Sequence, residues 1–97
     1  DSYTCAKGAI ISLAKSLAVQ FGPDNIRCNV IHPGMIDTPL QAPYLNEDKK
    51  KAIAAELPMR RLGAARDIAN AALFLASDES AWMTGAEMIV DGGFIAM

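Results

Sequence analysis

The chain has 97 residues, of which 52% are hydrophobic, and a formal net charge of -2. This suits one small unit with an apolar core and gives no reason to expect nucleic acid or an anionic membrane as a partner. No uncharged apolar run approaches the roughly 18 residues of a transmembrane helix. The two cysteines and one histidine form neither a disulfide framework nor a metal site. We therefore expect Cys5 and Cys28 to be buried, reduced thiols.

The first predicted element is a helix from Ser2 to the stop at Gly22-Pro23. Apolar residues recur on one face at helical spacing: Ala6, Ile10, Leu13, Leu17 and Phe21. The opposite face is small or apolar, with Cys5, Gly8, Ser12, Ser16 and Val19. A helix with so little polar surface is typical of one covered on both sides. We expect a helix–helix contact between subunits here.

A strand is predicted over residues 26–32, with Pro33-Gly34 ending it. His32, beside that break, is interpreted as a packed or hydrogen-bonded structural residue. Asn46 is placed to cap a helix that runs to about Leu57. Its run of lysines, residues 49–51, is interpreted as a solvated face.

A second apolar helix is predicted over residues 66–77, and a second strand over residues 86–90. The expected core positions of this helix are Ile68, Ala69, Ala72, Phe74 and Leu75. The order helix, strand, helices, strand is typical of a parallel α/β layer. Two strands alone make a poor independent sheet.

Tyr3 and Lys7 are four residues apart, so on a helix they lie on one face, a turn apart. A tyrosine phenol has a pKa of about 10 and is a poor acid at neutral pH. A nearby ammonium favours the phenolate and lowers that pKa, which makes the pair a candidate proton donor and acceptor. A tyrosine and a lysine on a helix surface would give the same pattern without any chemistry.

Further motifs follow in a fixed order: Asn29-Val30-Ile31-His32-Pro33-Gly34 with Ile36-Asp37-Thr38, Arg61-Leu62-Gly63, Asp67-Ile68-Ala69, Phe74-Leu75-Ala76-Ser77, Thr84-Gly85 and Val90-Asp91-Gly92-Gly93. With Tyr3-x-x-x-Lys7, this series resembles the C-terminal portion of the short-chain dehydrogenase/reductase family over essentially the whole chain. The resemblance implies an α/β fold, the C-terminal part of a Rossmann-like doubly wound parallel sheet, here with about two strands and three to four helices. It also implies NAD(P)-dependent interconversion of a secondary alcohol and a ketone.

The resemblance assigns roles to six positions. Tyr3 matches the tyrosine that exchanges a proton with the substrate oxygen, and Lys7 the lysine that lowers its pKa and holds the nicotinamide ribose. Pro33 and Gly34 match the turn beside the nicotinamide, and a Pro-Gly break would let the backbone approach a flat ring. Ile36 and Thr38 match contacts to the carboxamide, Ile36 through its backbone and Thr38 partly through its hydroxyl.

The resemblance also implies a mobile substrate lid over residues 39–57 and a dimer or tetramer formed through the first helix and the C-terminal strand. A small-molecule alcohol or carbonyl substrate and a cytoplasmic location are expected. The chain has no G-x-G-x-x-G or T-G-x-x-x-G-x-G motif to hold a pyrophosphate, and it does not decide between NAD and NADP.

Residues 1–97 are therefore expected to be part of a single Rossmann-like oxidoreductase domain, not a complete domain, and to be inactive alone. Two alternatives stay open. One is a catalytically inactive fragment that acts as a helix-mediated association module. The other is a self-standing small α/β binding domain, which would leave its sheet with open edges.

Overall fold

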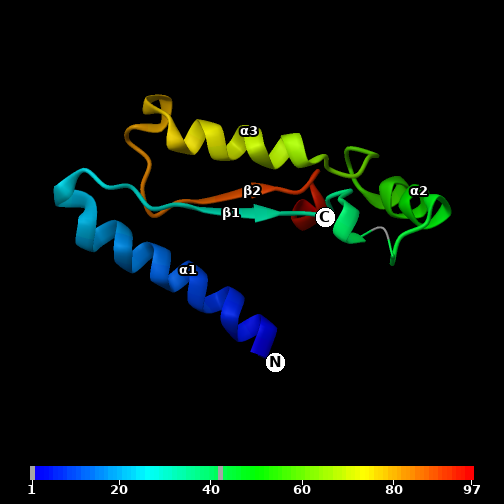
Figure 1. Ribbon diagram of the computed structural model, residues 1–97, viewed down its shortest axis with the longest axis horizontal. Helices are drawn as coiled ribbons and strands as arrows, with labels where there is room; N and C mark the ends of the chain where they lie inside the picture. Colours follow the sequence, from blue (N-terminus) through cyan, green and yellow to red (C-terminus); the bar gives the residue numbers. More distant parts are fainter. Residues whose placement is uncertain (1, 42) are drawn as a thin grey trace.

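The computed structural model describes residues 2–41 and 43–97, apart from the side chain of Tyr3. The helices and strands, in chain order, are α1 (Ser2–Phe21), β1 (Val30–Pro33), α2 (Glu47–Glu56), α3 (Ala65–Ala76) and β2 (Glu87–Val90), as Figure 1 shows. Short 3-10 turns lie at Gly22–Asp24, Pro39–Gln41, Asp78–Ser80 and Phe94–Ala96. The predicted helices and the second strand are thus present with small shifts at their ends.

β1 and β2 form a two-stranded parallel sheet in which Val30 lies opposite Glu87 and Pro33 opposite Val90. α3 packs against both strands, and α1 packs against β1. In Figure 1 the two strands lie between these helices, with α2 beyond the carboxyl ends of the strands. This layering confirms the predicted α/β class.

The strand predicted over residues 26–32 is shorter and ends later, at Pro33. Its partner begins only at Glu87, because the residues before it form a turn in which Gly85 has a φ of +70°. The Asn29 side chain replaces ladder bonds there, since it donates to the Met83 carbonyl at 3.0 Å and accepts from the Ala86 N–H at 3.0 Å. The sheet ladder therefore starts at Val30, and residues 26–29 are irregular.

Both later helices begin at side chains that accept backbone N–H groups. The Asn46 side-chain oxygen accepts from the Lys49 N–H at 2.8 Å, which confirms the predicted cap of α2. The Asp67 carboxylate accepts from the Ala64 N–H at 2.7 Å, in the manner of the third helical residue of a capping box. These contacts are local, so the sequence could place both helix starts.

The buried part of the described residues is small: Ala14, Ala18, Leu57 and Ser80. The accessible surface is 7113 Å², whereas a folded monomer of this mass is expected to expose roughly 5,400 Å². Two strands offer too narrow a face to cover the helices. As a result, Leu13 of the predicted α1 stripe is 58% exposed.

The expectation of a buried α3 core was wrong for the same reason. Ile68, Phe74 and Leu75 are only half-buried, and Ala69 and Ala72 are exposed.

The expectation of two buried thiols was also wrong. Cys5 is exposed and Cys28 is half-buried, and both are free. Within residues 2–41 and 43–97, no helix combines the length and apolar character that membrane spanning requires.

Candidate functional site

A hollow of about 680 Å³ lies between α1 and β1, next to the carboxyl end of the strand. α1 contributes Thr4, Lys7, Gly8, Ile10 and Ile11, and the strand with its following turn contributes Val30, Ile31, His32, Pro33 and Gly34. Three of the predicted site residues, Lys7, Pro33 and Gly34, therefore line one space although they are far apart in the chain. In parallel α/β sheets, the crevice at the carboxyl ends of the strands is where ligands bind.

The orientation of α1 follows from its small residues. Ala14 and Ala18 are buried, at 6% and 5% exposure, and the Ala18 side chain comes close to Gly85. Lys7 precedes them by seven and eleven residues, which is nearly two and three helical turns, so it lies on the same face. Tyr3 lies one turn before Lys7 on α1, and its side chain is outside the described part of the chain.

Gly34 is required by contact between the ends of the two strands. A Cβ atom at this position would lie 2.6 Å from the Asp91 Cα, and the Gly34 N–H donates to the Val90 carbonyl at 2.9 Å. A backbone neighbour cannot move aside as a flexible side chain can. The sequence analysis explained Gly34 by the approach of the backbone to a ligand ring. The structure adds a second reason, the close packing of Gly34 against Asp91, which could not be seen from the sequence around Gly34.

The backbone at Ile36 is oriented by a bridge to Gly63. The Gly63 N–H donates to the Met35 carbonyl, and the Asp37 N–H donates to the Gly63 carbonyl, each at 2.9 Å. In a parallel pairing of this kind, the N–H and C=O of the middle residue point to the opposite side. The N–H and C=O of Ile36 therefore point away from Gly63. On that side, they can form hydrogen bonds with an amide group of a ligand.

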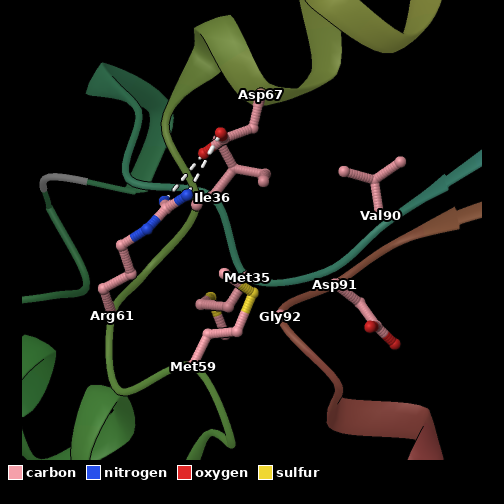
Figure 2. A pocket seen from close by; sticks show the side chains of 9 residues that line it. Met35, Ile36, Met59, Arg61, Asp67, Val90, Asp91 and Gly92 are labelled. Carbon is pink, nitrogen blue, oxygen red and sulfur yellow. Dashed lines mark hydrogen bonds and ion pairs between the residues drawn. The ribbon is translucent and has the colours of Figure 1, made fainter.

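The Ile36 side chain lines a separate pocket of about 210 Å³, shown in Figure 2. Thr38 is half-buried, and its carbonyl accepts from the Gln41 N–H at 3.0 Å in the following turn. The lining of the Lys7 hollow includes neither Ile36 nor Thr38. The structure thus brings three of the predicted site residues together and leaves these two on the segment that continues from the Pro-Gly turn.

Arg61 and Asp67 form a two-pronged ion pair at the pocket in Figure 2, with Nη1–Oδ2 at 2.8 Å and Nη2–Oδ1 at 3.2 Å. The hydrogen bond from Arg61, assisted by the Ala64 N–H, lowers the pKa of Asp67 to about 2. This pair joins the start of α3 to the connector that carries Gly63, and so holds the strand-like segment at Ile36.

Lys50 corrects the expectation of a solvated lysine face. Its ammonium lies 3.0 Å from Asp37 Oδ1 and 3.4 Å from Glu47 Oε1, and its side chain is 20% exposed. The hydrogen bond with Asp37 is the main cause that raises the pKa of Lys50. The spacing of Lys50, Ile53 and Leu57 along one helix face is the sequence signal that could have indicated an inward-facing lysine.

His32 is hydrogen-bonded, as interpreted, and it also lines the hollow between α1 and β1. Its Nε2 lies 3.2 Å from Glu87 Oε1, and Lys15 Nζ lies 3.3 Å from Glu87 Oε2. The hydrogen bond from Lys15 is the main cause that lowers the pKa of Glu87. This cluster connects α1 to both strands on one face of the sheet.

The family model for enoyl-(acyl carrier protein) reductases matches residues 1–95. A short-chain type dehydrogenase/reductase of Sinorhizobium fredii is 46% identical over 93 residues, which are 96% of this chain and 37% of that protein. The crystal structure of an oxidoreductase of the short-chain dehydrogenase/reductase family from Burkholderia thailandensis superimposes with a TM-score of 0.91 at 40% identity, covering 98% of this chain and 38% of that one.

A second similar structure is described as a 2-deoxy-d-gluconate 3-dehydrogenase from Agrobacterium tumefaciens, with NADP bound. Its TM-score is 0.88 at 38% identity, covering 99% of this chain and 39% of that one. The similar structures therefore identify the fold as part of a Rossmann-like parallel α/β sheet. The chain belongs to the short-chain dehydrogenase/reductase family, and it spans little more than a third of the length of the relatives it matches.

Proposed function

We propose that residues 1–97 form the C-terminal portion of a Rossmann-like oxidoreductase domain that interconverts a secondary alcohol and a ketone with NAD or NADP. The observation that carries this proposal is the hollow shared by Lys7, Pro33 and Gly34 at the carboxyl end of β1. The NADP bound to the Agrobacterium relative supports a nicotinamide cofactor.

The residues present fit such a cofactor. A lysine lines the hollow, and the Ile36 N–H and C=O point away from their bridge partner, Gly63. An amide donor and acceptor on one residue match the carboxamide group of a nicotinamide. Ile36 would hold that group through its backbone and Thr38 partly through its hydroxyl, while Pro33 and Gly34 would lie beside the ring. When bound, the nicotinamide supplies or accepts the hydride.

In this proposal, Tyr3 transfers the proton. In the reduction of a ketone, the Tyr3 phenol donates its proton to the substrate oxygen, and in the oxidation of the alcohol the phenolate accepts it. Lys7 stabilises the phenolate by its charge and also binds the ribose hydroxyls as a donor. Proton transfer therefore requires a phenol whose pKa can be lowered, Tyr3, and a cation one helical turn away that lowers it, Lys7.

An open sheet edge and an apolar groove beside it support the proposal that these residues are part of a larger domain. β1 pairs with β2 on one side, and the described residues supply no strand for its other edge. A groove of about 350 Å³ runs between that strand and α1, lined mainly by apolar side chains such as Ile10, Leu13 and Leu17. A neighbouring parallel strand from the rest of a doubly wound sheet would fill it. We therefore expect the 97-residue chain alone to show no turnover.

The proposal is tested with Lys7→Ala in the complete protein, by titration with NADH and NADPH and by steady-state kinetics. Loss of a charged donor should weaken cofactor binding by about tenfold or more and lower kcat as well. Lys15→Ala, on the same helix but outside the lining of the hollow, is the matched control and should change neither. Equal effects of the two substitutions would contradict the assigned role of Lys7.

The alternative, an inactive association module, draws support from the rear face of α1. Its residues Cys5, Gly8, Ser12, Ser16 and Val19 are all exposed. Ser12→Arg should reduce the assembly state in light scattering if this face forms a subunit contact. Gly8→Arg should do the same, but Gly8 also lines the hollow beside Lys7, so Ser12→Arg is the cleaner test. An unchanged assembly state would remove both this alternative and the proposed dimer or tetramer contact through α1.

A further inference from the structure

His32 lines the same hollow as Lys7, on the wall that β1 forms. It stands directly before the Pro33-Gly34 turn, and 33% of its side chain is exposed. Histidine has an ordinary pKa of about 6.5, so this side chain takes up and releases protons near neutral pH. The hollow to which we assign proton transfer therefore contains a second group that can exchange protons, in reach of solvent.

The contact between His32 and Glu87 decides which ring nitrogen carries the hydrogen. His32 Nε2 lies 3.2 Å from Glu87 Oε1. Glu87 is ionised near neutral pH, because the hydrogen bond from Lys15 lowers the pKa of its carboxyl group. A carboxylate only accepts hydrogen bonds, so Nε2 donates in this contact and Nδ1 of the neutral ring keeps its lone pair. His32 can therefore accept one further proton, at Nδ1.

Charged groups face the His32 ring from the two elements packed against it. From β2, the Glu87 carboxylate would form a charge-assisted hydrogen bond with the imidazolium that results when Nδ1 is protonated. From α1 come Lys15, whose Nζ lies 3.3 Å from Glu87 Oε2, and Lys7, which lines the hollow. A group that passes protons on must also release them, and the two cations favour release.

Oxidation of an alcohol releases one proton for each hydride transferred, so Tyr3 must lose its proton before the next turnover. We propose, as a step that rests on the proposed function, that His32 takes up this proton and passes it to solvent. Water in the hollow carries the proton from the Tyr3 phenol to Nδ1, which leaves Tyr3 as the phenolate and His32 as an imidazolium beside Glu87. The imidazolium then gives one proton to bulk water or to a buffer base. No electrons move in these transfers, and the reduction of a ketone runs them in reverse.

The first experiment uses His32→Gln in the complete protein, because a glutamine amide can still donate to Glu87 but cannot take up a proton at neutral pH. Oxidation of 2-butanol and of 2-deoxy-d-gluconate is followed in weakly buffered solution, with and without added imidazole. We expect kcat of His32→Gln to fall about tenfold without imidazole, less than the loss of a direct general base. Added imidazole should restore kcat to within about twofold of the wild type, by taking the proton in place of the ring.

The affinity of His32→Gln for NADH and its melting temperature should equal those of the wild type. Lys15→Ala, which leaves the contact between His32 and Glu87 in place, is the control and should keep the wild-type kcat without imidazole. An unchanged kcat in His32→Gln, or a loss that imidazole does not restore, would overturn this inference and leave the proposed function intact. A folded wild type that oxidises neither alcohol would contradict both.

The second experiment uses Glu87→Gln, which keeps the ring and removes the charge beside it. Its kcat in weakly buffered solution should fall less than that of His32→Gln and should also be restored by imidazole. The double variant should be no slower than His32→Gln, because the two residues act on one transfer. Losses of kcat that multiply would show that Glu87 acts separately and would contradict the proposed path. If His32→Gln does not fold, the imidazole response of Glu87→Gln decides alone, and a variant without such a response overturns the inference.

Discussion

On the α3 face of the sheet, Arg27 donates to Ser80 Oγ at 2.9 Å, to the Ser77 carbonyl at 3.1 Å and to the Met83 carbonyl at 3.3 Å. On the α1 face, the corresponding cation is Lys15, which pairs with Glu87 while 52% of its side chain is exposed. One face is closed by a partly buried network around the end of α3, and the other is held by small alanines and a solvated ion pair. We expect the Arg27 network to contribute more to stability than the Lys15–Glu87 ion pair, and the α1 face borders the hollow that includes Lys7.

The largest effect on stability is expected at Gly34, which packs against Asp91 just after the ends of β1 and β2. Gly34→Ala would place a Cβ atom 2.6 Å from the Asp91 Cα, and forcing such overpacking should cost about 3 kcal/mol. Urea denaturation of the complete protein measures this cost. Gly8→Ala is the control, because no heavy atom lies within 4 Å of its Cβ position, and helix propensity should stabilise that variant by up to about 1 kcal/mol. Equal stability of the two variants would show that the strand ends can separate freely.

The next largest effect compares the contributions of the α3 face and the α1 face to stability. Arg27→Ala removes charged donors from two carbonyls and the Ser80 hydroxyl, and we expect a loss of about 2 kcal/mol in the free energy of unfolding. Lys15→Ala should lower the melting temperature by less, because exposed ion pairs contribute little. If Lys15→Ala were the more damaging substitution, the assignment of stability to the α3 face would be wrong.

The smallest effect depends on pH. Asp67 has a pKa of about 2 in the folded chain, below its ordinary value of 3.8, because Arg61 and the Ala64 N–H bind its charged form. Its contribution to stability is present above the ordinary value and is lost as the pH falls through that value toward the folded one. The difference in melting temperature between the wild type and Asp67→Asn should therefore shrink between pH 5 and about pH 2. Asp78→Asn, at an exposed position, is the control; a difference that stays constant with pH would exclude this linkage.

The sequence predicted the features that depend on neighbours along the chain. The Asn46 cap, the ends of α3 and the alternation of helix and strand all follow from local spacing. The convergence of Lys7 with Pro33-Gly34 was predicted by the family resemblance, and the shared hollow gives it a geometric basis.

Contacts between distant segments were not predictable in the same way. The Arg27–Ser80 bond joins residues 53 positions apart. Asn29 shortened β1 by bonding to a turn 54 to 57 residues away. Lys50 differs from its neighbours in the lysine run because Asp37 lies opposite it, and no local pattern records that partner.

The most direct test of the central claim is Tyr3→Phe in the complete protein, because this change removes one hydroxyl and keeps the ring. We predict that kcat falls by at least about 100-fold, while the affinity for NADH or NADPH and the melting temperature stay nearly unchanged. A Tyr3→Phe protein with undiminished turnover would contradict the claim that α1 carries the proton-transfer group.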